Sequence, residues 1–288
     1  MFERHIDPEG WGRCQGTTPN GSRFTVHDHG AQVTEWVPAG ADPVLWTSTR
    51  ARYAEWTAIR GGIPICFPWF AAGRKDNKSP AHGFARLARW QLVNGQDTGS
   101  TITLHWRLDQ TMIPAIEGVD PTRNRFQLDC TQVFGDDLTL TFRVRNTDSV
   151  PLVIEEALHT YFHVGDITGV QVHGLAGTEY LDKLTGAFDT HIGPVVFEGP
   201  VDRVHWTSET IEIHDPTLGR RIIITTEHAH NTVVWTPWEE GAAELSDIAD
   251  GEWREFVCVE TANVRNKAVH LNPGQAHELR LTLAVADL

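Results

Sequence analysis

Two segments of the sequence combine an imidazole or a carboxylate with a strand-like pattern. In Glu155-Glu-Ala-Leu-His159-Thr-Tyr-Phe-His163, an extended chain places His159 and Tyr161 on one face, because alternate side chains of a strand share a face. Glu260 follows the apolar residues 256–259, and an unpaired carboxylate is costly there if it is buried. We expect Glu260 to lie either at a solvent-exposed rim or in a site that raises its pKa. An imidazole and a carboxylate are suited to general acid–base catalysis.

Two further segments supply cationic side chains. Arg60 opens Arg60-Gly-Gly-Ile-Pro-Ile-Cys-Phe-Pro-Trp-Phe70, where a guanidinium beside two glycines can sit where backbone approaches a ligand closely. His82 and Arg86 fall within five residues of each other on a loop-like stretch that begins at Ser79. Each segment also has an ordinary interpretation. The first could be a rigid apolar loop packed on the core, and the second a solvated surface loop.

The histidines and cysteines do not predict a metal site. His159 and His163 have the spacing of a helical zinc pair, but the glutamate of the HExxH motif is missing and the context is a strand. The pairs at His27/His29 and His228/His230 lack a third ligand at a fixed spacing. The four cysteines are scattered without a CxxC pair, which indicates free thiols. We therefore expect no metal.

The elements that must position these residues are strands. Residues 138–145 alternate apolar and polar side chains, and the same period of two recurs at 102–106 and 279–285. A β-branched run follows at 222–226. Turn residues at 135–137, 146–151 and 215–219 separate strand-like stretches, and only residues 237–248 favour a short helix. This pattern predicts one antiparallel all-β domain over residues 1–288, with two sheets packed face to face.

Composition limits the partners. The 288 residues are 40% hydrophobic and 22% charged, which is enough for a sizeable core. Acidic residues exceed basic ones by 38 − 24 = 14, so the chain is not suited to general binding of nucleic acid or of an anionic membrane. An anionic ligand would need a local cluster of cations. No apolar run approaches the roughly 20 residues of a membrane helix, and the first residues show no signal peptide. We expect a cytoplasmic monomer.

Taken together, the segments resemble a known family. Arg60-Gly-Gly-Ile-Pro-Ile-Cys-Phe-Pro, His82-Gly-Phe-Ala-Arg86, Ala157-Leu-His-Thr-Tyr-Phe162 and Val257-Cys-Val-Glu260 occur in the order seen in the hexose-6-phosphate mutarotases of the aldose 1-epimerase superfamily. Tyr180-Leu-Asp-Lys183 and Val233-Val-Trp-Thr-Pro-Trp238 are supporting matches. The resemblance spans roughly residues 30 to 285, and it is the ordered combination of motifs that makes it specific.

The resemblance implies a fold, a reaction and a set of residue roles. The fold is the galactose-mutarotase-like β-supersandwich of large antiparallel sheets with few short helices. The reaction is the interconversion of the α and β anomers of a hexose 6-phosphate, with glucose 6-phosphate as the expected partner and no cofactor. The implied roles are a general acid (His159), a general base (Glu260), a histidine that orients the sugar (His82), an acidic residue on sugar hydroxyls (Asp202) and arginines on the 6-phosphate (Arg60 and Arg86).

Three alternatives remain open from the residues. An aldose 1-epimerase acting on free hexoses would use the same acid and base without a phosphate site. A non-catalytic carbohydrate-binding protein could share the fold, because fold does not fix function. A glycosidase needs two carboxylates that flank the scissile bond, and the sequence supplies only one strong candidate beside a histidine. The glycosidase ranks last.

Overall fold

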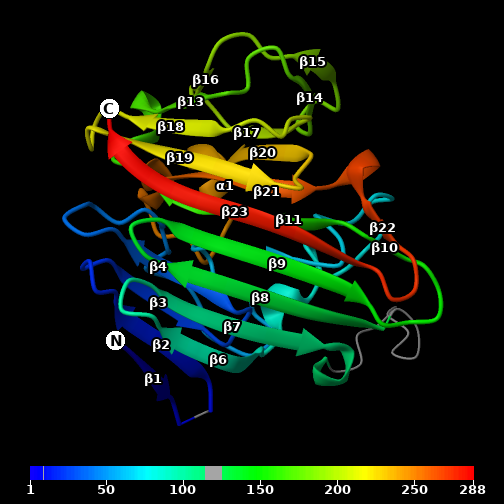
Figure 1. Cartoon of the computed structure of the whole chain (residues 1–288). Helices are drawn as coiled ribbons and strands as arrows, with labels where there is room; N and C mark the ends of the chain where they lie inside the picture. The colour runs from blue at the N-terminus through cyan, green and yellow to red at the C-terminus, as the bar shows by residue number, and fades with distance from the viewer. Residues whose placement is uncertain (9, 114–124) are drawn as a thin grey trace.

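The computed structural model of the chain describes residues 1–8, 10–113 and 125–288, and these form antiparallel sheets (Figure 1). The sheet with the most strands in this part of the chain has nine, and it crosses the front of the view in Figure 1. In spatial order its strands are β16 (Val195–Val196), β13 (Gln171–His173), β18 (Ile211–Asp215), β19 (Arg220–Glu227), β23 (Ala276–Asp287), β9 (Leu138–Asn146), β8 (Phe126–Phe134), β7 (Ile102–Asp109) and β6 (Gln91–Asp97).

A second large sheet carries the segments that the sequence singled out. It has eight strands in the described chain. Their spatial order is β15 (Phe188–Thr190), β14 (Glu179–Asp182), β17 (Val201–His205), β20 (Asn231–Thr236), β21 (Phe256–Asn263), β11 (Glu156–Leu158) and β5 (Ile65–Cys66), and β12 (Tyr161–His163) also pairs with β21.

Smaller elements complete the described structure. The N-terminal sheet consists of β1 (Phe2–Ile6), β2 (Gly12–Thr17), β3 (Arg23–His27) and β4 (Gln32–Val37), and β10 (Leu152–Ile154) pairs with β22 (Val269–Leu271). The α-helix in this part of the chain is α1 (Trp238–Ala243). Single 3-10 turns lie at η1 (Ala85–Leu87), η2 (Gln110–Met112), η3 (Ile167–Gly169), η4 (Glu252–Glu255) and η5 (Arg265–Lys267).

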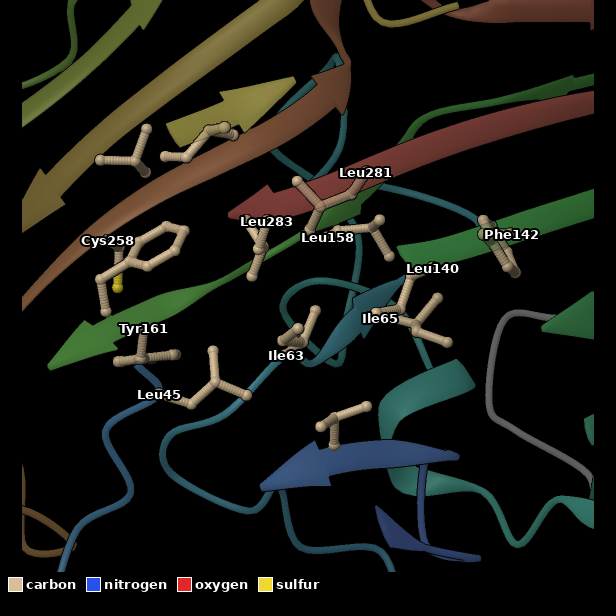
Figure 2. Packing of buried hydrophobic residues seen from close by; sticks show 14 of the residues in the cluster. Leu45, Ile63, Ile65, Leu140, Phe142, Leu158, Tyr161, Cys258, Leu281 and Leu283 are labelled. Carbon is tan, nitrogen blue, oxygen red and sulfur yellow. The ribbon is translucent and has the colours of Figure 1, made fainter. Parts of the chain in front are cut away.

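The core lies between the two large sheets. The inward row of β9, which includes Leu140 and Phe142, is fully buried, as the alternation of apolar and polar residues predicts. It belongs to the same hydrophobic cluster as Leu283 of β23 and Leu158 and Ile65 from the eight-stranded sheet. Figure 2 shows these side chains meeting between the ribbons. Burial of both inner faces fixes the register of each strand, because a shift of one residue would expose the apolar row.

The predicted elements are confirmed with one adjustment. The alternating stretches are β9, β7 and β23, the β-branched run lies in β19, and all three turn segments separate strands. The helix is shorter than the expected 237–248. It ends at Ala243, and the chain then turns so that Asp247 reaches Arg60. No helix in residues 1–8, 10–113 or 125–288 is long and apolar enough to span a membrane.

Glycines in two of the motifs allow chain segments to approach closely. Gly62 has a φ of 62°, and a Cβ there would lie 2.1 Å from the carbonyl oxygen of Val33. Gly83 has a φ of 70°, and its Cβ would lie 2.0 Å from the carbonyl oxygen of Phe67. Neither position has room for a side chain. Gly83 therefore holds the loop that carries His82 and Arg86 against the loop that follows Arg60.

We expect Gly83→Ala to lower the free energy of unfolding by more than the matched variant Gly99→Ala. Gly99 also has a positive φ, of 82°, but a Cβ there would meet nothing within 4 Å. Gly99→Ala should therefore cost only the backbone strain, on the order of 1–2 kcal/mol. Gly83→Ala adds a steric clash to this strain. Urea unfolding of both variants measures the difference, and equal losses would contradict the close-packing role of Gly83.

Candidate active site

Strand register brings His159 beside Glu260. Strand β11 pairs with β21 so that Leu158 lies opposite Thr261. Because the strands are antiparallel, His159, which follows Leu158, lies opposite Glu260, which precedes Thr261. The Nε2 atom of His159 lies 3.4 Å from the Oε1 atom of Glu260, and the two side chains are only 7% and 1% exposed. Glu260 lies within β21 and not at the end of its strand, so the rim position considered from the sequence is wrong.

Burial changes the protonation of both groups. Removal from water raises the pKa of Glu260 well above its ordinary value, and the nearby negative charge of Asp202 raises it further. Burial also lowers the pKa of His159 well below its ordinary value, and the positive charges of Arg86 and Arg60 add to this effect. These shifts favour a neutral carboxyl group next to a neutral imidazole. The two groups then share one ionisable proton.

Each member of the pair keeps an unused polar atom. Oε2 of Glu260 and Nδ1 of His159 are buried and have no hydrogen-bond partner in the described structure. A buried polar atom without a partner costs about 1–3 kcal/mol, so the fold keeps these atoms at a loss of stability. A bound molecule with hydroxyl groups could satisfy them.

His82 completes a cluster of imidazoles. Its ring centroid lies 5.2 Å from that of His159, and the edge of Phe70 packs against it at 4.8 Å. The backbone N–H of His82 donates to the carbonyl oxygen of Ala71 at 2.7 Å. Burial is the largest cause that lowers the pKa of His82 well below its ordinary value, followed by Arg86. The loop that carries His82 therefore packs into the site, and the interpretation as a solvated surface loop is wrong.

The two predicted arginines have different surroundings. Arg60 donates from Nη1 to the hydroxyl group of Tyr161 at 2.9 Å and from Nε to Asp247 at 3.1 Å. Arg86 donates from Nη2 to the carbonyl oxygen of Ala81 at 3.0 Å, while its Nε is buried without a partner. Among the described residues no carboxylate pairs with Arg86. Its guanidinium therefore retains charge and a donor for a ligand, whereas Arg60 is partly neutralised.

Asp202 reaches the site from β17, which is separated from β21 by β20. It lies opposite Trp235 of β20, which in turn lies opposite Cys258 of β21, two residues before Glu260. Residues two apart share a face of a strand, so Asp202 and Glu260 lie on the same side of the sheet. Lys183 holds Asp202 in an ion pair of 2.6 Å. Burial raises the pKa of Asp202, and Lys183 counteracts this effect.

The structure adds residues that the sequence did not assign to the site. Asp247 fixes Arg60, and Lys183 fixes Asp202. Aromatic rings enclose the imidazole of His159, with Tyr161 stacked on it at 4.9 Å and the ring of Trp235 at 5.9 Å. Lys183 lies within a motif of the family resemblance, so a signal for it existed. Asp247 lies in a segment without any recognisable motif.

The histidine that follows in the same segment lies elsewhere. His163 is at the end of β12 and lines a cavity whose walls include neither His159 nor Glu260. Strand pairing is interrupted at His159 and Thr160, between β11 and β12, and this break separates the two imidazoles. In the described part of the chain, no group of three or more His, Cys, Asp or Glu side chains is arranged to hold a metal ion.

Known proteins are similar to this chain over most of its length. A protein of Cenchrus ciliaris named "Putative glucose-6-phosphate 1-epimerase" is 34% identical over 267 residues, which cover 90% of this chain and 80% of the relative. The crystal structure of a "putative mutarotase (YeaD)" from Salmonella typhimurium superimposes with a TM-score of 0.90 at 28% identity, covering 100% of this chain and 94% of the other.

A more distant structure supports the fold alone. A galactose mutarotase-like protein of Clostridium acetobutylicum has a TM-score of 0.77 at 13% identity and covers 100% of this chain and 99% of its own. The large antiparallel sheets are thus those of the galactose-mutarotase-like fold. The profile of the family described as Aldose 1-epimerase matches residues 14–284. The chain therefore belongs to the aldose 1-epimerase family.

Proposed function

We propose that this chain interconverts the α and β anomers of a hexose 6-phosphate, with glucose 6-phosphate as the substrate. The observation that carries the proposal is the buried His159–Glu260 pair at 3.4 Å, which lies within the electrostatic influence of two guanidinium groups. The pair supplies an acid and a base, and the arginines supply charge for an anion. The name of the Cenchrus ciliaris relative supports the same substrate.

The chemistry requires two coupled proton transfers on one carbon atom. In the cyclic sugar the anomeric hydroxyl and the ring oxygen are both bonded to C1. Glu260 as carboxylate removes the hydroxyl proton while His159 as imidazolium protonates the ring oxygen, the bond from C1 to the ring oxygen breaks, and C1 becomes an aldehyde. Rotation about the C1–C2 bond presents the other face, and the reverse transfers close the ring.

The proton count of the pair matches this reaction. A carboxylate with an imidazolium carries the same single proton as the neutral carboxyl and neutral imidazole that burial favours. The active form therefore requires a transfer within the pair and no proton from solvent. After ring opening the pair again holds one proton. Because either group can donate or accept, the same site serves both ring opening and ring closure.

The surrounding residues have supporting roles. Asp202, held by Lys183, can accept hydrogen bonds from sugar hydroxyls, and His82 can orient the sugar beside His159. Arg86 and Arg60 bind the 6-phosphate, for which guanidinium groups are well suited. The unpaired Nε of Arg86 favours a phosphorylated sugar over a free hexose. In a chain of net charge −14, these side chains provide a local positive region.

We expect the wild-type chain to accelerate anomer exchange of glucose 6-phosphate and Glu260→Gln to lose roughly 10²–10⁴-fold of that rate, because the amide cannot accept the proton. Two-dimensional exchange NMR on the equilibrium mixture measures the rate. Glu156→Gln is the matched control, since Glu156 is also buried and pairs with a histidine, His277, at 2.9 Å outside the site. Equal rates for Glu260→Gln and wild type would exclude Glu260 as the base.

Replacement of Arg86 should separate the phosphorylated sugar from the free one. We expect Arg86→Gln to raise KM for glucose 6-phosphate by about 10- to 100-fold, the loss expected for a charged hydrogen bond, and to raise KM for free glucose much less. The exposed Arg89, which pairs with Asp28, provides the control variant Arg89→Gln. Equal effects of Arg86→Gln on both sugars would instead favour an aldose 1-epimerase for free hexoses.

Glu260 should make stability depend on pH. Its pKa in the folded chain is raised above the unfolded value, so the folded chain binds more protons between the two values. The contribution of Glu260 is therefore present at low pH, and about 1.4 kcal/mol is lost per pH unit as the pH rises through that interval. Glu260→Gln should remove this loss.

Urea unfolding at pH 5 and pH 8 tests the prediction. The free energy of unfolding of Glu260→Gln minus that of wild type should be larger at pH 8 than at pH 5, which means that the variant gains stability relative to wild type as the pH rises. A difference between the two proteins that does not change with pH would show that the carboxyl group is ionised in both states.

A further inference from the structure

A cavity lies away from the catalytic pair. It has a volume of about 830 Å³, within the range of small-molecule sites. Strands β2, β3 and β4 of the N-terminal sheet form one side of it, and η4 and the loops around Trp46 and Tyr53 form the other. Its walls include none of the six residues that the resemblance assigned to the site. Trp46 separates the two regions, because its inner face stacks on Tyr161, which in turn stacks on His159.

Two buried polar side chains of this cavity have unused atoms. Asp28 and His29 are 0% and 3% exposed and both line the cavity. Oδ2 of Asp28 accepts from the backbone N–H of Gly12 at 2.8 Å and from Nε of Arg89 at 3.1 Å, but Oδ1 has no partner. Nε2 of His29 is also buried and unpaired. An acceptor oxygen and an imidazole nitrogen of this kind suit a ligand with hydroxyl groups.

Aromatic rings accompany these polar atoms. Trp11 stacks on His29 with a centroid distance of 4.8 Å and an interplanar angle of 24°. Tyr53, which is 51% exposed at the rim, lies 4.8 Å from the ring of His27. Flat apolar faces beside hydrogen-bonding atoms match the mixed surface of a sugar ring, whose C–H groups pack on an aromatic face while its hydroxyl groups bond at the edge.

The charges of the cavity disfavour an anion. Asp7, Glu35, Glu252 and Glu255 line it together with Asp28, and Arg13 is the arginine in its wall. Burial lowers the pKa of His27 and of His29 to about 4, so these imidazoles are neutral at pH 7. A phosphorylated sugar would meet a negative environment.

Two of the lining carboxylates, Glu35 and Glu252, also accept hydrogen bonds from protein donors. Glu35 accepts from the hydroxyl group of Thr25 at 2.8 Å. Glu252 accepts from the hydroxyl group of Ser48 at 2.8 Å and from the backbone N–H of Thr49 at 2.9 Å. The buried polar atoms that remain unpaired beside them include Oδ1 of Asp28 and Nε2 of His29.

We propose that this cavity is a second carbohydrate-binding site, which takes an uncharged saccharide with its hydroxyl groups on Asp28 and His29 and a ring face on Tyr53. The site differs from the catalytic one in ligand class, since it excludes the phosphate that Arg60 and Arg86 would bind. It does not depend on the proposed reaction, because no residue of the His159–Glu260 pair contributes to it.

Saturation-transfer NMR with methyl β-D-glucopyranoside and with maltose tests the proposal. We expect both wild type and Glu260→Gln to bind at least one of these sugars, also in the presence of excess glucose 6-phosphate. Tyr53→Ala and His29→Phe should each raise Kd by about tenfold or more, or abolish binding. His29→Phe keeps an aromatic ring against Trp11 and removes the unpaired nitrogen. Phe188→Ala removes a comparably exposed ring, 63% exposed, far along the chain on β15 and should bind as wild type does.

Several results would overturn the proposal. One is that neither sugar binds, and another is that both cavity variants keep the wild-type affinity. A third is that binding is lost in Glu260→Gln or on addition of glucose 6-phosphate, because this loss would assign the signal to the catalytic site. Binding of choline but of neither sugar, in a parallel titration, would show that the carboxylates select a cation. Anomer exchange measured on the same samples reports separately on the proposed enzymatic function.

Discussion

The proposed catalytic site depends on one interaction, the contact between a buried carboxyl group and a buried imidazole. The register between β11 and β21 places Glu260 3.4 Å from His159 at a depth where neither charge is well solvated. In water at pH 7 the carboxyl group would be ionised and the imidazole partly protonated. Burial instead favours their neutral forms, with one proton held between them. Every other part of the site either maintains this environment or brings a ligand to it.

The charged neighbours of the pair are fixed by partners of their own. Asp247 holds Arg60, and Lys183 holds Asp202, so two of the nearby charges are largely compensated within the protein. Arg86 differs, because no described carboxylate neutralises it and its Nε is unpaired. Uncompensated positive charge of this kind favours an anion, which supports the proposed phosphorylated substrate. Tyr161 and Trp235 exclude water from the imidazole, which strengthens these electrostatic effects.

Local patterns predicted much of the fold but only part of the site. Alternation along 138–145 identified β9 and its buried row because strand geometry has a period of two. Local alternation within a strand could not show which strands pair. Strand pairing is what brings His159 to Glu260, about 100 residues later in the chain. The family resemblance supplied that association, and the geometry is consistent with it. Asp247 was missed because its role depends on a turn after α1 that packs against a distant loop.

Two errors of interpretation have the same physical origin. Local sequence alone favours a rim position for Glu260 and a solvated loop for His82, because charged and polar residues usually lie at the surface. Glu260 is instead buried, and His82 is partly covered by tertiary contacts such as that of Phe70. Polar residues that tertiary contacts force into the interior are costly, and folds retain them where function requires them. His163, only four residues from His159, shows that proximity in sequence does not place a histidine in the site.

The most direct test of the shared proton is an NMR titration of the pair itself in the chain labelled with ¹⁵N-histidine and ¹³C-glutamate. Spectra of His159→Gln and Glu260→Gln assign the two signals. We predict that the imidazole of His159 stays neutral down to well below pH 6.5, and that the carboxyl group of Glu260 stays protonated well above the ordinary range for glutamate. An imidazole that titrates near pH 6.5, together with a carboxyl group that ionises near pH 4.5, would show an ordinary solvated ion pair and would contradict the account.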